Sequence, residues 1–326
     1  MAFVEVRGLR LHYQEWGPAD AQAAIVLVHG LGSSCHIWDF VAPLLAEASP
    51  ASEGISGDEG LTAGSGSAPA RGASWSQARR GLRVVALDQR GHGQSDQPDS
   101  GYDFGSVVAD LTAFLDAVGL PGRSVVVGHS WGASVVLHFA VTHPDRTAGL
   151  ALVDGGTGSP GERWTWAEAE QRLRPPDLDG MAWSELRQRI AGNGGAVPSS
   201  RAEVVGRSVF DIDAEGRVTR RFRIPNHMQV VRAFWEQRPA ELLEQVQCPL
   251  LILPARWGTD ASEMSSAKAA GVARTQALQP KARVRWFEDT VHDVPLQRPE
   301  ELADELLGLA ELAGLGADLG YSVGTT

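Results

Sequence analysis

The chain has 326 residues, a formal net charge of −11, 43% hydrophobic and 21% charged residues. This length and composition are typical of one large globular α/β domain with an inserted segment. The acidic balance argues against nucleic-acid binding. No apolar run is long enough to span a membrane, and the N-terminus lacks a signal-peptide pattern, so we expect a cytoplasmic protein. The two cysteines, Cys35 and Cys248, offer neither a disulfide framework nor a metal cluster.

The beginning of the chain predicts a hairpin followed by a buried strand. Residues 3–6 and 9–13 have the pattern of two short strands joined by a turn. Residues 24–28 are continuously apolar, as in a parallel strand that is covered on both faces. Residues 49–80 are dominated by Ala, Ser and Gly. We expect a flexible surface insertion there, because so few large apolar side chains cannot offset the entropy lost on ordering.

Strands and helices then alternate along the chain. Residues 82–87, 124–127 and 148–153 have strand patterns, and residues 104–118 and 133–140 have helical ones. This alternation predicts a mostly parallel sheet that is flanked by helices on both faces.

The composition changes after residue 154. Residues 155–247 are rich in Trp, Arg, Pro and Glu and have helical patches, and a strand pattern resumes at residues 250–253. We therefore expect a helical cap at 155–247, inserted between two strands of a core formed by residues 1–154 and 248–312.

The last part of the chain predicts one more strand and a closing helix. Residues 282–287 have the strand pattern, and residues 299–312 have the helical one. Glu300 and Glu301 stand in the first turn of that helix, where its dipole favours negative charge. Residues 313–326 have the composition of a loose tail.

A Gly-x-Ser-x-Gly motif is the main chemical signal. It spans Gly128–Gly132 and lies between a predicted strand and a predicted helix, which is the setting of a nucleophile at a sharp, exposed turn. Ser130 is therefore the candidate nucleophile. The N–H of Trp131, at the start of the helix, and the N–H of Leu31, after the first parallel strand, are the candidate oxyanion donors.

A serine hydroxyl needs a histidine base, which in turn needs a carboxylate. His292 follows the last predicted strand in a short loop from which its side chain can reach back over the sheet, so it is the candidate base. Acids in such sites fall between the serine and the histidine in chain order. Asp260 fits this order and is the first candidate, and Asp154, at the end of the preceding strand, is the alternative.

Aromatic residues near these positions favour an apolar or aromatic substrate. Trp38, His36, Trp164 and Trp235 are candidates for substrate contact, although a single tryptophan is more often part of a core. We expect no cofactor and no metal. The expected partner is a small-molecule ester or related acyl substrate, and the oligomeric state is not encoded in any pattern that we recognise.

Four segments together resemble the α/β-hydrolase fold superfamily, in the branch that carries a helical cap. The resemblance covers residues 3–310 apart from the insertion, and it implies the same nucleophile, base and oxyanion donors without a cofactor. The segments are His29-Gly30-Leu31-Gly32-Ser33-Ser34, Asp88-Gln89-Arg90-Gly91-His92-Gly93-Gln94-Ser95-Asp96, Gly128-His129-Ser130-Trp131-Gly132 and Val291-His292-Asp293-Val294-Pro295-Leu296.

Two departures from the family pattern affect the predicted function. Haloalkane dehalogenases and epoxide hydrolases of this branch carry Asp where this chain has Ser130. The segment 253–260 is about two residues longer than the family turn, which leaves Asp260 and Asp154 both open as the acid. We predict a serine hydrolase for a small carboxylic ester or lactone. The alternatives are a C–C bond hydrolase or amidase with the same residues, and a non-catalytic ligand-binding protein on the same fold.

Overall fold

The computed structural model describes residues 2–21, 23–47, 82–120, 122–192, 196–258 and 262–315. The insertion predicted at 49–80 therefore lies outside the described residues, as does the predicted tail from residue 316 onward.

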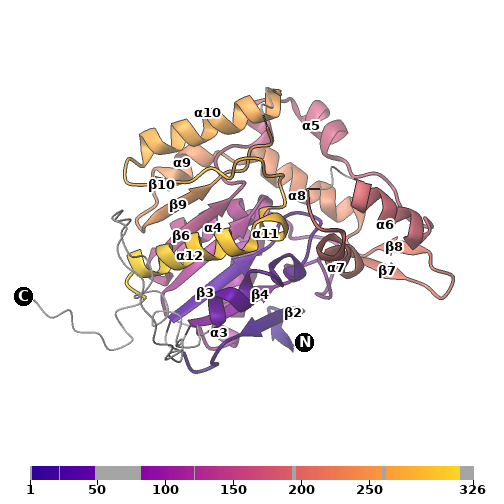
Figure 1. Cartoon of the computed structure of the whole chain (residues 1–326), viewed down its shortest axis with the longest axis horizontal. Coiled ribbons are helices and arrows are strands. Elements are labelled where there is room, and N and C mark those ends of the chain that lie inside the picture. Colours follow the sequence, from indigo (N-terminus) through magenta and orange to yellow (C-terminus); the bar gives the residue numbers. More distant parts are fainter. Residues whose placement is uncertain are drawn as a thin grey trace, which may run out of the picture.

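An eight-stranded, mostly parallel sheet forms the centre of the molecule (Figure 1). Its strand order is β1-β2-β4-β3-β5-β6-β9-β10. β1 and β2 form the predicted antiparallel hairpin, β2 is antiparallel to β4, and the remaining pairs are parallel. The strands are β1 (Ala2–Val6), β2 (Leu9–Trp16), β3 (Ala23–Val28), β4 (Leu82–Leu87), β5 (Ser124–His129), β6 (Thr147–Val153), β9 (Leu250–Leu253) and β10 (Arg283–Val284).

Helices cover both faces of this sheet, as the alternating pattern predicts. Successive strand residues point to opposite faces, so Val26 and Val126 pack in one core while Ile25 and Val125 pack in the other. The first core lies under α3 (Phe104–Ala117) and α4 (Trp131–Thr142). The second lies under α1 (Ala42–Ala46) and α12 (Pro299–Leu312). The strands are buried on both sides, which explains their continuous apolar runs.

The segment between β6 and β9 is mostly helical, and most of it lies at one end of the sheet (Figure 1). It also holds a two-stranded hairpin that the sequence did not predict, with Gly216 at its turn in the left-handed conformation. Its own core is small and contains Leu186, Phe210 and Val218. Its elements are η3 (Pro160–Glu162), α5 (Trp166–Leu173), α6 (Trp183–Gly192), α7 (Ser199–Val209), β7 (Phe210–Ile212), β8 (Val218–Arg220), α8 (Ile224–Glu236) and α9 (Pro239–Leu243).

A short last strand and several further helices complete the described fold. β10 is shorter than the predicted strand at 282–287, because after Val284 the chain keeps only an isolated bridge between Ala255 and Phe287.

No helix among the described residues has both the length and the apolar character needed to cross a bilayer. The remaining helices are η1 (Cys35–Trp38), η2 (Pro144–Arg146), α10 (Glu263–Leu278) and α11 (Val294–Gln297).

Candidate active site

Ser130 occupies a strained turn between β5 and α4. Its backbone has φ 56° and ψ −123°, a conformation that side chains other than glycine rarely adopt and that is concentrated at functional sites. The turn is held by hydrogen bonds on both sides of the peptide. Ser130 N–H donates to the carbonyl of Val153 at 2.9 Å, and Ser130 carbonyl accepts from Ala133 N–H at 3.1 Å. The strain is consistent with a serine that is presented at the edge of the sheet.

Two glycines allow the loop after β3 to lie directly against this turn. A Cβ atom on Gly132 would collide with the carbonyl oxygens of Val28 and His29, and a Cβ atom on Gly30 would lie 2.8 Å from the Cβ of Ser130. Leu31 follows Gly30 in this loop. Trp131 is the first residue of α4, so its N–H has no partner within the helix and lies at the positive end of the helix dipole.

His292 lies between Ser130 and a buried carboxylate. Its Nε2 is 2.8 Å from Ser130 Oγ, and its Nδ1 is 2.6 Å from Asp154 Oδ2. The loop that carries His292 is held against β5, because His129 Nε2 donates to the His292 carbonyl at 2.9 Å. A hydroxyl, an imidazole and a carboxylate are therefore hydrogen-bonded in series. This is the arrangement that lets an imidazole accept the serine proton.

Asp154 follows the last residue of β6, and its side chain is 0% exposed. Burial alone raises its pKa, but His292, Lys268 and the N–H of Ala255 together lower the pKa to about 2. Ala255 N–H donates to Asp154 Oδ1 at 2.8 Å, and Lys268 Nζ lies 2.7 Å from the same oxygen. The carboxylate is therefore charged at neutral pH.

The pKa of His292 rises above its ordinary value. The surrounding protein shields part of the imidazole from water, and this desolvation lowers the pKa. The hydrogen bond and the charge of Asp154 more than offset that effect, with a further contribution from Asp293. Lys268 acts in the opposite direction. The imidazole side chain is 54% exposed, so one side of His292 remains open to a ligand.

The two candidate acids have different outcomes. Asp260, the first candidate, lies outside the described residues. The carboxylate at His292 Nδ1 belongs to Asp154, the alternative candidate. Its backbone has φ 45°, and its N–H donates to the Leu253 carbonyl, so the chain turns sharply at the end of β6 and directs the side chain toward His292. Asp154 already fills the position in which Asp260 was expected, and it replaces Asp260 as our candidate for the acid.

A cavity of about 630 Å³ opens beside this series. Ser130, Asp154 and His292 line it from the sheet, Lys268 lines it from α10, and the inserted segment supplies the opposite wall. Most of the exposed lining is apolar, which favours an uncharged, carbon-rich ligand portion. The wall from the inserted segment includes Gly156, Thr157, Pro160, Arg163, Trp164, Leu173 and Phe234.

Of the four candidates for substrate contact, one lines the cavity. Trp164 lines the cavity. Trp235 does not, but its indole N–H donates to the Trp164 carbonyl at 2.7 Å and supports that wall. Trp38 is wrong as a contact residue, since it is 0% exposed and packs in the core beneath α1. His36 bonds Asp39 at 2.8 Å and is not among the residues that line the cavity.

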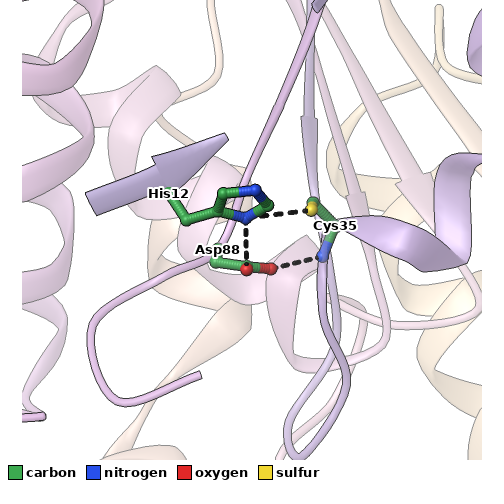
Figure 2. A group of neighbouring side chains, drawn as sticks. All are labelled: His12, Cys35 and Asp88. Carbon is green, nitrogen blue, oxygen red and sulfur yellow. Dashed lines mark hydrogen bonds and ion pairs between the residues drawn. The ribbon is translucent and has the colours of Figure 1, made fainter. Parts of the chain in front are cut away.

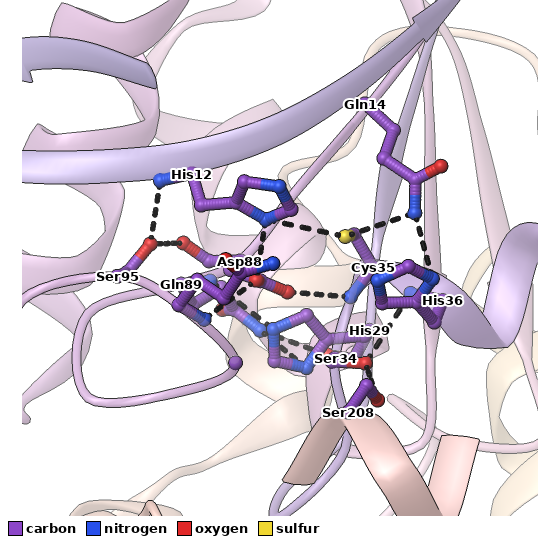
Figure 3. A network of polar contacts seen from close by, with 12 residues as sticks. His12, Gln14, His29, Ser34, Cys35, His36, Asp88, Gln89, Ser95 and Ser208 are labelled. Carbon is purple, nitrogen blue, oxygen red and sulfur yellow. Dashed lines mark hydrogen bonds and ion pairs between the residues drawn. The ribbon is translucent and has the colours of Figure 1, made fainter. Parts of the chain in front are cut away.

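A buried polar network holds the loop that carries Leu31 (Figure 3). His29 Nδ1–H donates to the Gly30 carbonyl at 2.8 Å, and its Nε2 accepts from Gln89 N–H at 3.1 Å. Ser34 Oγ lies 2.5 Å from Ser208 Oγ on α7. The sequence had not indicated this last contact, which joins the loop to the inserted segment.

The network is centred on Asp88, whose carboxylate lies beside His12 and Cys35 (Figure 2). The nitrogen, sulfur and oxygen atoms that these three side chains could offer to a metal lie within 4.8 Å of one another. Asp88 already accepts the N–H groups of Cys35 and Gln94, at 2.7 and 2.9 Å. Burial strongly raises the pKa of the Cys35 thiol, whereas a metal requires the thiolate. This donor set fits a structural role and does not fit a metal.

The eight-stranded, mostly parallel sheet with helices on both faces is the fold of an α/β hydrolase. The chain belongs to the alpha/beta hydrolase family, whose model matches residues 25–305.

Several other proteins are similar to this chain, over different shares of its length. Non-heme chloroperoxidase of Streptomyces lividans is 25% identical over 93% of this chain and 97% of its own length. Epoxide hydrolase B of Mycobacterium tuberculosis is 34% identical, but the match covers only 44% of this chain and 32% of that protein. Among solved structures, E-2-(acetamidomethylene)succinate hydrolase has a TM-score of 0.72 at 20% identity, with 95% of this chain and 98% of that chain covered. The enol-lactonase of Burkholderia xenovorans LB400 has a TM-score of 0.65 at 18% identity, with 95% and 100% covered. These two similarities concern the fold.

Proposed function

We propose that this protein is a serine hydrolase that cleaves a small carboxylic ester or lactone through an acyl-enzyme. The observation that carries the proposal is the series Ser130 Oγ to His292 Nε2 at 2.8 Å and His292 Nδ1 to Asp154 Oδ2 at 2.6 Å. It is supported by Ser130 itself, since the epoxide hydrolases of the cap-bearing branch have Asp at this position.

The reaction begins with attack of Ser130 Oγ on the substrate carbonyl, while His292 Nε2 takes the hydroxyl proton. Asp154, charged and buried, holds the imidazole in the tautomer with the proton on Nδ1 and stabilises the imidazolium that forms. His292 then gives the proton to the departing alcohol. Water attacks the acyl-enzyme with the same histidine as base, and this step releases the acid and restores Ser130.

Negative charge develops on the carbonyl oxygen in both tetrahedral intermediates. We assign its stabilisation to the N–H groups of Trp131, which follows Ser130, and of Leu31, in the loop after β3. One such donor contributes about 3–4 kcal/mol to the stability of the transition state. The close approach of Gly30, the neighbour of Leu31, to Ser130 supports this assignment.

We assign residues 155–247 the role of a cap. They supply one wall of the cavity, including Trp164, Leu173 and Phe234. A cavity of about 630 Å³ accommodates a small substrate, and its apolar lining suits an aliphatic or aromatic acyl group.

Hydrolysis of p-nitrophenyl acetate and butyrate by Ser130→Ala tests the proposal. We expect kcat/KM to fall by about 10⁴-fold or more, because the hydroxyl forms the covalent bond. The matched control is Ser134→Ala on the same helix, since Ser134 is 0% exposed and does not line the cavity. Equal rates for Ser130→Ala and the wild type would refute the proposed nucleophile.

A further inference from the structure

Lys268 makes a direct contact with the carboxylate that holds His292. It projects from α10, and its Nζ lies 2.7 Å from Asp154 Oδ1 and 3.0 Å from Asp154 Oδ2. The same ammonium group donates to the Ala255 carbonyl at 2.8 Å. Ala255 N–H in turn donates to Asp154 Oδ1. Ala255, which follows β9, thus donates to Asp154 and accepts from Lys268. These two hydrogen bonds fix the lysine relative to the carboxylate.

This contact makes Lys268 and His292 share one carboxylate. Asp154 Oδ2 lies 2.6 Å from His292 Nδ1 and 3.0 Å from Lys268 Nζ. A Ser-His-Asp site needs a carboxylate that stabilises the imidazolium. A permanent cation on the same carboxylate stabilises its charge, but it also repels the positive charge that the imidazole gains during the reaction.

Other titratable groups also lie around His292, and Glu162, Arg163 and Arg274 line the same cavity. Asp293 is its neighbour in the chain, and the ring centroid of His129, on β5, lies 4.8 Å from that of His292. His129 itself is buried, and burial is the main cause that lowers its pKa to about 4, so it is neutral when the site works. Lys268 is a cation that opposes protonation of His292, and it is bound to the same carboxylate.

We propose that Lys268 is a positioning residue for the hydrolase reaction: it fixes the Asp154 carboxylate and limits how strongly that carboxylate stabilises protonated His292. The inference rests on the proposed function, since it assigns a role within that site. Without Lys268, its positive charge no longer offsets the effect of the Asp154 carboxylate on His292. The His292 imidazole then keeps its proton up to a higher pH. A smaller fraction of the enzyme therefore has a neutral His292 at neutral pH.

The pH dependence of kcat/KM for Lys268→Met tests this role. We expect the midpoint of the acid limb to move upward by about one pH unit, because a cation near the imidazole is removed. Lys268→Arg keeps the charge and should keep a midpoint near that of the wild type. Lys281→Met is the matched control, because Lys281 is the other lysine of the chain and is exposed beyond the end of α10.

An unchanged or lower midpoint in Lys268→Met, in a variant that retains the wild-type melting temperature, would overturn the proposal. The titration of the His292 imidazole by NMR, assigned with His292→Gln, gives the same comparison without any substrate. It must show the same upward shift. Failure of the proposed function is recognised separately, since there Ser130→Ala would hydrolyse the esters as fast as the wild type.

Discussion

The same carboxylate–imidazole pair occurs twice at this edge of the sheet, with different surroundings. His12 Nδ1 lies 2.7 Å from Asp88 Oδ2, and His292 Nδ1 lies 2.6 Å from Asp154 Oδ2. The side chains of the first pair are 0% and 1% exposed. In the second pair the carboxylate is equally buried, but the imidazole is 54% exposed. The distance between histidine and carboxylate therefore does not distinguish a catalytic pair from a structural one.

The second ring nitrogen distinguishes the two pairs. His292 uses Nδ1 for the carboxylate and Nε2 for Ser130. In His12 the same Nδ1 faces both Asp88 and Cys35, and among the described residues Nε2 has no hydrogen-bond partner (Figure 2). Because no described hydroxyl lies at His12 Nε2, the imidazole has no serine from which to take a proton while Asp88 orients it. The buried pair holds loops together, and the open pair is arranged for chemistry.

Asp154→Asn should produce the largest effect and affect only the open pair. We expect kcat to fall by about 10³–10⁴-fold, because an amide does not stabilise the imidazolium and favours the wrong tautomer. The measurement is ester hydrolysis, alongside the melting temperature to establish that the variant is folded. A folded Asp154→Asn with near wild-type turnover would return the role of the acid to Asp260 or another residue.

Asp88→Asn should affect stability instead. The carboxylate is buried and accepts backbone N–H groups from two loops. Breaking such a buried pair typically costs about 3–5 kcal/mol of unfolding free energy. We expect that loss in denaturant unfolding, with kcat per folded molecule reduced by less than about tenfold, because the variant leaves Ser130 and His292 untouched. A loss of turnover as large as that of Asp154→Asn, without a loss of stability, would contradict the distinction between the pairs.

Acid should destabilise the fold through its buried neutral histidines. A histidine whose pKa is lowered in the folded state binds its proton only after unfolding, so stability falls as pH drops below about 6.5. His36 and His292, whose pKa values are raised, oppose this trend. The histidines with a lowered pKa, in each case mainly because of burial, are His29, His92, His129, His138 and His227.

We expect the unfolding free energy to fall by roughly 2–4 kcal/mol between about pH 6.5 and about pH 5. Urea unfolding across this range measures it. Asp88 and Asp154, whose pKa values are lowered to about 2, lose their contribution only at lower pH, below the ordinary value of 3.8. An unfolding free energy that stays constant or increases as the pH falls from about 6.5 to about 5 would show that these histidines are protonated in the folded protein.

Much of the fold could be predicted because the parallel strands are buried on both faces. Their continuous apolar runs, such as residues 23–28, are visible in the sequence without any partner information. The hairpin β7–β8 was missed because each of its strands has only three residues. The only signals for it were Gly216 at the turn and the alternation of Phe210, Asp211 and Ile212.

The site could be predicted only in part. Ser130 lies in a local motif that is visible in the sequence, and His292 was selected by its position after the last strand. The choice between Asp154 and Asp260 depends on where the chain turns after two neighbouring strands, which no periodicity encodes. Lys268 was missed because a lone lysine on a helix becomes informative only when its contact with Asp154 is known. Trp38 was misassigned because an aromatic side chain near a site has the same pattern when it belongs to the core.

Covalent labelling of the nucleophile tests the central claim most directly. The intact protein is treated with a p-nitrophenyl alkylphosphonate, and the modified peptide is identified by mass spectrometry, with Ser130→Ala as the control. The account predicts one label for each chain, on Ser130, with complete loss of ester hydrolysis and no label in the variant. A label on another residue, or hydrolysis that continues after Ser130 is fully labelled, would contradict it.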